Sequence, residues 1–158
     1  MEENFKMVAK TFYGFEDILS NELLKLGAQK IEKGSRSVSF YGDKGFMYKA
    51  NLSLRTAIKI LKPIRSFKFK DQEDFYNKIY KIDWEKHLNK DSSFLVSSIV
   101  FHSQLFNHSK YVSQKVKDAV VDRFRDLFKK RPDVELKYPD LRINIHINRN
   151  TCNVSLDS

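Results

Sequence analysis

The stretch HSKYVSQKVKDAVVDRFRDLFKKR, residues 108–131, predicts the longest helix of this 158-residue chain. Apolar residues recur along it at helical spacing and form one inward stripe: Val112, Val116, Val120, Phe124, Leu127 and Phe128. Pro132 follows directly and is expected to end the helix, because proline cannot continue the helical hydrogen bonding. The second half of the chain should therefore bury this stripe.

The elements around this helix give the second half the order α-α-β-α-β-β. They are a helix over 71–82, a short helix over 83–88, a strand over 92–103, the long helix, a strand over 141–148 and a strand over 151–156. Asp71 and Asp83 are the expected N-caps of the two shorter helices. The residues from Leu141 to Asn148 alternate apolar and polar, which is typical of a half-buried strand. Asn150 opens a tight turn, so the chain should end in a hairpin.

The first half has a different order, β-α-β-β-α-β. Its expected elements are a strand over 5–11, a helix over 15–26, two strands near 31 and 38–41, a helix over 44–55 and a strand over 57–61. Gly27 is expected to close the first helix, and Pro63 marks an edge or exit of the last strand. This order is the ferredoxin-like pattern. The predicted fold class is therefore α+β, with two modules that divide near residue 65.

Positive charge is concentrated in residues 44–70. This segment has no acidic residue and eight basic ones: Lys44, Lys49, Arg55, Lys59, Lys62, Arg65, Lys68 and Lys70. It accounts for most of the formal net charge of +9, and such a segment attracts polyanions. Four aromatic residues lie within it, Phe46, Tyr48, Phe67 and Phe69, and rings between cations suit unstacked nucleic acid. The alternative interpretation is a solvated basic face whose aromatic residues belong to the core.

A second basic feature lies at the start of the long helix. Asn107 or Ser109 is expected to cap it, and the first-turn N–H groups favour an anion. Lys110, Gln114 and Lys117 share a face opposite the valine stripe. The pattern indicates a phosphate site, and the alternative is an ordinary solvated helix face.

The residues needed for catalysis or cofactor binding are missing at the required spacings. None of the five glycines forms a GxGxxG or phosphate-loop pattern. His102 and His108 have no cysteine or acidic partner nearby in sequence, and Cys152 lies in a predicted core strand as an inert thiol. We therefore expect no enzyme, no cofactor and no metal site in this chain.

The chain also lacks the sequence features of membrane and exported proteins. No apolar run approaches the about 20 residues of a membrane span. The first residues have neither the basic start nor the apolar stretch of a signal peptide. A cytoplasmic protein without a membrane partner is expected.

Three stretches of the second half carry a resemblance to a known family: residues 113–124, 131–134 and 139–145. They resemble the THUMP domain of large-subunit rRNA guanine-N2 methyltransferases. The opening FYGFE at residues 12–16 and the stretch 38–55 are similar to the N-terminal region of those enzymes. The resemblance covers nearly the whole chain.

The resemblance implies a ferredoxin-like domain over residues 1–65 packed on a THUMP RNA-binding domain over residues 66–158. In that family a Rossmann-type methyltransferase domain follows, binds S-adenosylmethionine and carries an Asn/Asp-Pro-Pro-aromatic motif. The prolines of this chain, at 63, 132 and 139, are never adjacent, and residue 158 lies about where the connection to that domain would begin. The catalytic domain is therefore expected to be absent from this chain, and S-adenosylmethionine to belong to the parent enzyme.

The expected function is to capture structured RNA, most simply rRNA, for a C-terminal methyltransferase domain. A tRNA-modifying methyltransferase and a basic protein-interaction module are the alternatives. The expected phosphate contacts are Lys110, Lys115, Lys117 and Arg142, supported by Arg55, Lys59, Lys62 and Arg65. The residues expected to contact sugar or base are Asn107, His108 and Tyr111.

Overall fold

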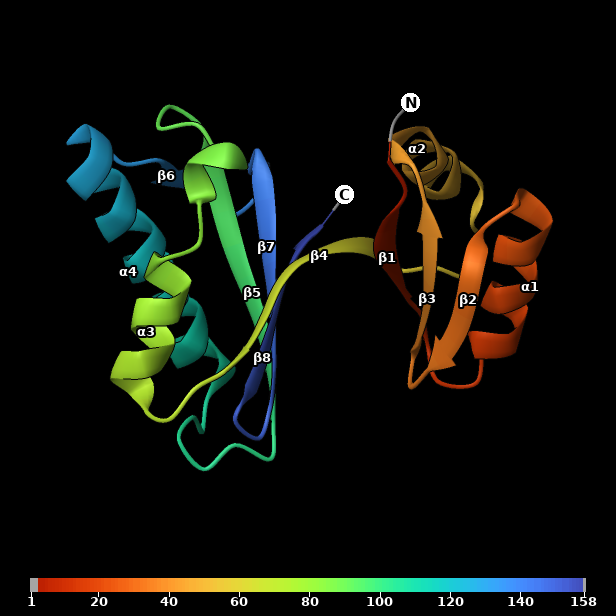
Figure 1. Cartoon of the computed structure of the whole chain (residues 1–158), viewed down its shortest axis with the longest axis horizontal. Coiled ribbons are helices and arrows are strands. Elements are labelled where there is room, and N and C mark those ends of the chain that lie inside the picture. The colour runs from red at the N-terminus through yellow and green to blue at the C-terminus, as the bar shows by residue number, and fades with distance from the viewer. Residues whose placement is uncertain (1–2, 158) are drawn as a thin grey trace. The chain divides into compact units, whose positions relative to one another are not determined.

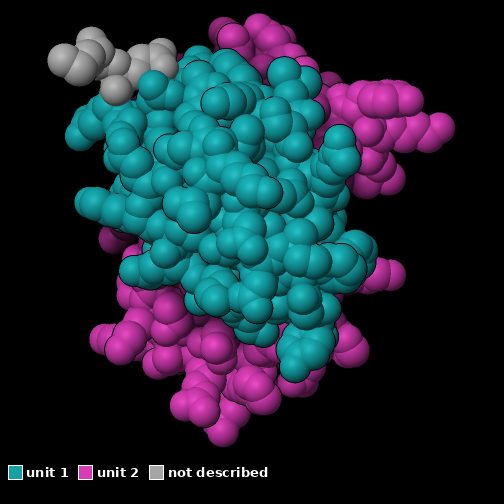
Figure 2. Space-filling view, turned by 90° about the vertical axis from the view of Figure 1, so that its right-hand side faces the viewer, with its two compact units in different colours: residues 1–63, 157–158 teal, residues 64–156 magenta. Residues whose placement is uncertain are grey.

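The computed structural model describes residues 3–157 and divides the chain into two compact units. Unit 1 comprises residues 1–63 and 157–158, and unit 2 comprises residues 64–156 (Figure 2). Each unit combines helices and strands and has a hydrophobic core of its own. The predicted α+β class is confirmed.

Unit 1 is a small antiparallel sheet with two helices (Figure 1). Its elements are β1 (Phe5–Lys10), α1 (Glu16–Leu26), β2 (Gln29–Gly34), β3 (Ser37–Gly42), α2 (Lys44–Ser53) and the first part of β4 (Lys59–Lys68). The strands lie in the order β2-β3-β1-β4. The buried core consists of Met7, Ala9, Leu19, Leu23, Val38, Phe40, Ala50 and Ile60. The predicted ferredoxin-like order is thus confirmed.

Local signals explain where the helices of unit 1 begin and end. Gly27 takes the left-handed conformation, with φ 99°, and closes α1. Asp43 caps α2, because its side chain accepts the Phe46 N–H at 2.7 Å. The Glu22 carboxylate on α1 accepts the backbone N–H of Arg55 at 2.8 Å and so joins α1 to the loop after α2. Burial disfavours the ionised carboxylate, but these donors prevail and hold the pKa of Glu22 below its ordinary value.

Unit 2 places two helices over a sheet that contains parallel strands. Its elements are the second part of β4, α3 (Gln72–Tyr80), a 3₁₀ turn η1 (Trp84–Lys86), β5 (Ser93–Phe101), α4 (Ser109–Phe128), β6 (Asp133–Val134), β7 (Leu141–Asn148) and β8 (Thr151–Asp157). The strand order is β4-β8-β7-β5-β6, and β5 runs parallel to both β6 and β7. α3 and α4 lie side by side and cover the same face of the sheet (Figure 1).

Alternation along the strands sends the apolar residues of unit 2 under the two helices. Ile143, Ile145 and Ile147 of β7 are fully buried with the valines of α4, whereas the residues between them belong to the opposite face. Phe69, Phe75 and Phe106 pack ring against ring in the same core. Burying this apolar face is the main force that holds α4 to the sheet.

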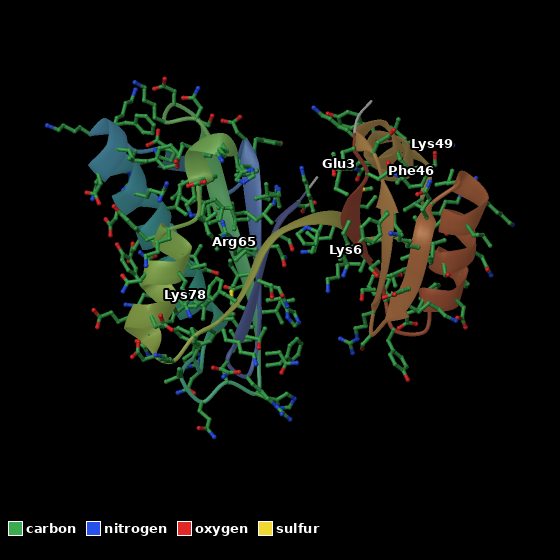
Figure 3. The ribbon with its side chains drawn as sticks, viewed as in Figure 1. Glu3, Lys6, Phe46, Lys49, Arg65 and Lys78 are labelled. Atoms are coloured by element: carbon green, nitrogen blue, oxygen red, sulfur yellow. The ribbon has the colours of Figure 1, made fainter. Side chains whose placement is uncertain are left out.

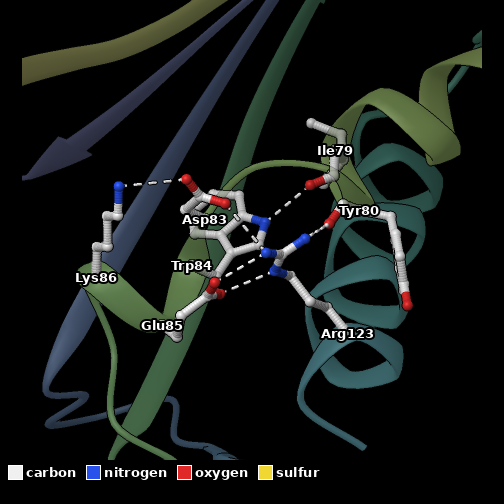
Figure 4. Close-up of polar contacts among 7 residues, drawn as sticks. All are labelled: Ile79, Tyr80, Asp83, Trp84, Glu85, Lys86 and Arg123. Atoms are coloured by element: carbon white, nitrogen blue, oxygen red, sulfur yellow. Dashed lines mark hydrogen bonds and ion pairs between the residues drawn. The ribbon is translucent and has the colours of Figure 1, made fainter. Parts of the chain in front are cut away.

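A guanidinium on α4 joins the helices of unit 2 (Figure 4). Arg123 donates two hydrogen bonds of 2.8 Å to Glu85, one of 3.1 Å to Asp83 and one of 2.9 Å to the Tyr80 carbonyl. Its side chain is 15% exposed. The Trp84 indole N–H donates to the Ile79 carbonyl at 2.9 Å, so the turn η1 is attached to α3 as well. Hydrogen bonding to Arg123 lowers the pKa of Glu85 to about 2.

Two expectations about strands were wrong or incomplete. β4 does not leave the sheet at Pro63 but continues to Lys68. Pro63 lies beyond the part of β4 that pairs with β1, which is Lys59–Leu61, and a proline is tolerated where its missing N–H is not required by a ladder. The two-residue strand β6 was not predicted, because so short a segment has no periodic signal.

The long helix also differs from its prediction. α4 ends at Phe128, before Pro132, because Lys129 takes the left-handed conformation and donates its N–H to the Arg125 carbonyl. Leu127 and Phe128 are 52% and 45% exposed and so lie outside the buried stripe. The other four residues of the stripe are buried, together with Ala119 and Val121.

Of the two N-cap predictions for the shorter helices, one is confirmed and one was wrong. Asp71 does cap α3, since its carboxylate accepts the Asp74 N–H at 2.7 Å. Asp83 precedes η1 but makes no side-chain cap, because its carboxylate faces Arg123 and Lys86 instead. Charge pairing has replaced capping at this position.

Cys152 is fully buried, as expected, and burial raises the pKa of its thiol to about 12. Within residues 3–157 no three His, Cys, Asp or Glu side chains are grouped so that they could hold a metal ion. In the same part of the chain no helix has the length and apolar character needed to cross a membrane.

Candidate nucleic-acid interface

A groove runs between the first turns of α4 and the edge of β5. It has a volume of about 420 Å³ and is lined by Phe94, Leu95, Val96, Ser97, Ser98, Ser109, Lys110, Ser113, Gln114, Lys117 and Val134. β6 pairs with β5 only at Ser93 and Phe94, so along the rest of β5 the described residues place no strand on this edge. The groove begins where β6 ends.

Serines attach α4 to β5 along this groove. The Ser98 hydroxyl donates to the Ser109 carbonyl at 2.8 Å and also contacts the Ser113 hydroxyl. These contacts fix the first turns of α4 against the strand. The helix start therefore presents its side chains from a rigid support.

Lys110, Gln114 and Lys117 all line the groove, as their shared helix face predicts. Lys117 lies 4.0 Å from Asp118, at the limit of an ion pair, and Gln114 donates to the same carboxylate at 3.0 Å. Among the described residues Lys110 has no ion-pair partner. Two ammonium groups thus border an open groove whose lining residues include no Asp or Glu.

Lys115 and Tyr111 occupy the neighbouring stripe of α4. The Lys115 ammonium lies 5.8 Å from the centre of the Tyr111 ring. The Tyr111 hydroxyl donates to Gln72 at 2.9 Å, which orients the ring toward α3, and 46% of the side chain stays exposed. The three predicted lysines are therefore close together but do not form a single face.

The prediction that Asn107 or Ser109 caps α4 was wrong. His108 is the N-cap residue, and no side chain in the described chain caps this helix end. Asn107 and His108 are both exposed. The first-turn N–H groups therefore remain available to water or to an anionic ligand.

Arg142 lies apart from these residues. It pairs in register with Leu95 on β5 and alternates with the buried isoleucines of β7, which puts it on the sheet face opposite α4. Its guanidinium approaches the Lys137 carbonyl at 3.4 Å. The structure does not bring Arg142 to the groove.

The basic segment 44–70 is dispersed rather than a single stripe. Arg55 is exposed in the loop after α2, Lys59 starts β4, and the Lys62 ammonium lies 4.5 Å from the centre of the Phe5 ring. Arg65 projects from the part of β4 in unit 2, and Lys49 donates to the Leu26 carbonyl at the end of α1 (Figure 3). Of the four residues expected to support RNA binding, Arg55, Lys59 and Lys62 belong to unit 1 and Arg65 belongs to unit 2.

The aromatic residues of that segment mostly belong to the cores. Phe69 is buried, and Phe46 and Phe67 are partly buried against apolar clusters. Only Tyr48 is largely exposed, at 55%, with Lys44 near its ring. For three of the four rings the alternative interpretation, core packing, was the right one.

The sequence interpretation missed the contribution of β5 to the groove. The paired serines Ser97 and Ser98 interrupt an otherwise apolar strand. Polar residues within a strand whose other residues are mostly apolar indicate that one edge or face of the strand is open. These two serines could therefore have indicated the groove.

Comparison with known proteins gives two family matches. The model of the THUMP domain matches residues 69–157, and that of the RlmL ferredoxin-like domain matches residues 6–61. Over 157 residues the chain is 36% identical to the ribosomal RNA large subunit methyltransferase K/L of Syntrophotalea carbinolica. The match covers 99% of this chain and 22% of that protein. The protein of the same name from Aeromonas salmonicida is 35% identical, with 99% of this chain and 21% of the relative covered.

A solved structure shares the fold of the whole chain. The crystal structure of a predicted N6-adenine-specific DNA methylase from Listeria monocytogenes superposes with a TM-score of 0.82 at 23% identity. The match covers 98% of this chain and 40% of that one. The chain spans only about a fifth of the length of the two methyltransferases compared above.

Proposed function

The chain belongs to the THUMP domain family, and from this premise we propose that it is the RNA-binding N-terminal part of an RNA methyltransferase. The two relatives described above are named as methyltransferases of the large-subunit ribosomal RNA. Their names support rRNA over tRNA as the partner of this chain. Guanine N2 is the methylation target that we assign to the parent enzyme. We also assign residues 1–65 to the ferredoxin-like domain and residues 66–158 to the THUMP domain.

S-adenosylmethionine would be bound by a catalytic domain outside this chain. The strand-to-helix loop between β1 and α1 contains a single glycine, Gly14, flanked by exposed aromatic residues. A dinucleotide-like cofactor needs several glycines at such a turn, so that the backbone can approach it closely. The described residues do not fit the cofactor, and we assign no chemical step to them.

The groove beside α4 is the observation that carries the RNA-binding proposal. Lys110 and Lys117 border it, the uncapped N–H groups of α4 are close by, and no acidic residue lines it. RNA phosphates would bind the two ammonium groups and the helix N-terminus, whereas Lys115 and Tyr111 would contact an adjacent nucleotide. Contacts of this kind read backbone shape rather than base sequence.

Arg142, Arg55, Lys59, Lys62 and Arg65 make no contact at this groove in the proposal, because none of them lines it. Arg142 lies on the sheet face opposite α4, Arg65 belongs to β4, and the other three belong to unit 1. Asn107 and His108 are close to the helix start and remain candidates for contacts to sugar or base.

Salt dependence of RNA binding tests the proposal. If the chain neutralises about five phosphates, the logarithm of its affinity for a single-stranded rRNA fragment should fall with the logarithm of salt at a slope of about −3.5. Replacing Lys110, Lys115 and Lys117 together by Ala should flatten the slope by about 2. The matched variant changes Arg55, Lys59 and Lys62 to Ala and removes the same charge. It should flatten the slope by no more than about 0.7, because none of the three lines the groove and only Lys59 lies opposite another lysine, Lys10.

The outcome distinguishes an RNA interface beside α4 from an RNA interface in unit 1 and from a protein-interaction module. Loss of binding only in the Arg55/Lys59/Lys62 variant would place the interface in unit 1 and contradict the α4 proposal. No RNA binding by the unmodified chain would favour a protein-interaction module. Far-UV dichroism of each variant must match that of the unmodified chain.

A further inference from the structure

Three strand ends of unit 1 bring basic residues together. Lys10 at the end of β1 pairs in register with Ser37 of β3 on one side and with Lys59 of β4 on the other. The N–H of the next residue, Thr11, donates to the Arg36 carbonyl at 2.9 Å. Lys10, Lys59 and Arg36 therefore gather at one end of this sheet.

Lys10 and Lys59 form an unfavourable pair for a purely structural role. Residues directly opposite in an antiparallel ladder share a face, and like charges in these positions destabilise the sheet. Within residues 3–157 neither ammonium group has an acidic partner. Burial, and secondly the charge of Lys59, lower the pKa of Lys10. An anion placed between the two ammonium groups would remove the repulsion.

The loop that follows Lys10 exposes aromatic rings. Phe12 is 64% exposed and Tyr13 is 78% exposed. Hydrogen bonds tie this loop to the β2–β3 turn, because the Glu16 carboxylate accepts the Gly14 N–H at 2.9 Å and the Arg36 N–H at 3.1 Å. Among the rings of residues 3–157, Phe12 meets only the edge of the Phe15 ring, at 6.3 Å between centroids, and most of both the Phe12 and Tyr13 side chains faces water.

The acidic residues nearby are already satisfied. The Glu16 carboxylate is occupied by backbone donors, which lower its pKa, and Asp17 forms an ion pair of 2.6 Å with Lys33. Glu16 keeps its negative charge, but Lys10, Lys59 and Arg36 outnumber it, so the net local charge is positive. Cations beside exposed rings suit a nucleotide chain better than an apolar or basic protein surface.

We propose that this end of unit 1 is a second RNA-binding surface, on which a phosphate binds between Lys10 and Lys59 and unpaired bases stack on Phe12 and Tyr13. Arg36, at the adjacent hairpin turn, supplies a further cation to the same strand of RNA. This inference rests on the proposed RNA-binding function but concerns a surface separate from the groove beside α4.

The test measures binding of the full chain to a fluorescein-labelled single-stranded RNA of about 20 nucleotides over a range of salt concentrations. The double variant Lys10→Gln/Lys59→Gln should weaken binding and flatten the salt slope by about 1.4, from two lost phosphate contacts. The double variant Phe12→Ala/Tyr13→Ala should weaken binding about tenfold with the slope unchanged, because stacking is not ionic.

Matched controls come from exposed residues elsewhere. Lys25→Gln/Lys90→Gln removes the same charge, and Tyr138→Ala removes a ring that is 87% exposed in unit 2. Both controls should bind like the unmodified chain. Phe12→Trp, with Tyr13 unchanged, keeps both stacking surfaces. This variant should bind RNA nearly as tightly as the unmodified chain.

Two results would overturn the inference in distinguishable ways. If the unmodified chain and the controls bind RNA, and the unit 1 variants bind equally well while the α4 triple variant is impaired, only this surface is rejected and a protein partner becomes its better occupant. If the unmodified chain binds no RNA, the proposed function fails and this inference fails with it.

Discussion

The two halves of helix α4 hold their charged side chains in different ways. In the C-terminal half, Arg123 is surrounded by Glu85, Asp83 and the Tyr80 carbonyl, and Asp122 accepts the Tyr76 hydroxyl. In the N-terminal half Lys110 and Lys117 border an open groove, and within residues 3–157 their nearest acidic partner is Asp118, 4.0 Å from Lys117. Losing one member of a hydrogen-bonded charge cluster leaves the other charges uncompensated and destabilises a fold, whereas charges without partners are free to bind a ligand.

The largest effect on stability is expected for Arg123→Ala. Its removal leaves the Glu85 carboxylate and the Tyr80 carbonyl without this donor, while Asp83 keeps Lys86, so the free energy of unfolding should fall by about 2 kcal/mol. Urea denaturation measures this change. The control Arg125→Ala, at an exposed position on the same helix, should change it by less than about 0.5 kcal/mol. Equal losses in both variants would mean that the Arg123 cluster has no special role.

A smaller and pH-dependent effect is expected for Glu85→Gln, because Arg123 keeps Asp83 and the Tyr80 carbonyl as partners. The pKa of Glu85 is depressed from 4.5 to about 2, so its stabilising contribution is present above pH 4.5 and is lost as the pH falls toward 2. The unmodified chain should therefore be more stable than the variant at pH 6, and the difference should vanish near pH 2. A difference that stays constant over this range contradicts the ion-pair account, and Glu73→Gln on α3 serves as the control.

Tyr76→Phe should have a still smaller effect. It removes only the hydroxyl that donates to Asp122, and a hydrogen bond of this kind contributes about 1 kcal/mol. Burial and the hydrogen bond to Asp122 raise the pKa of Tyr76, so the loss should be the same from pH 6 to pH 9. Tyr138→Phe, at a side chain that is 87% exposed, should leave thermal unfolding unchanged.

The smallest effect on stability is expected for Lys110→Ala/Lys117→Ala. Neither lysine has a strong partner, so the free energy of unfolding should change by less than about 0.5 kcal/mol. RNA affinity should fall in this variant and stay unchanged in Arg123→Ala. A large loss of stability here would show that the groove lysines are structural, and would remove the contrast between the two halves of α4.

Much of the fold was predictable because burial leaves a periodic pattern in sequence. The valines of α4, the alternation of β7, Asp71 as a cap and Gly27 as a helix end each identified their element. The course of β4 past Pro63 was not predictable, since it depends on partner strands that are distant in sequence. The exposed Leu127 and Phe128 continue the helical spacing of the stripe but extend past the sheet contacts that bury the other residues.

The candidate site was harder to predict than the fold. Spacing placed Lys110, Gln114 and Lys117 on one face correctly, but it could not show that β5 supplies the other wall of the groove. Charge density along the sequence suggested a single stripe over residues 44–70, whereas alternation in β4 and the turn after α2 send those side chains in several directions. Linear clustering of charge does not predict clustering on a folded surface.

Lysine acetylation footprinting tests the central contrast most directly, because it requires no substitution. The chain is treated with an acetylating reagent with and without a single-stranded rRNA fragment, and the modified lysines are measured by mass spectrometry. The account predicts that RNA protects Lys110, Lys115 and Lys117, while Lys129 and Lys130 at the other end of α4 react equally in both samples. Protection at Lys129 and Lys130 with none at Lys110 and Lys117 would contradict it.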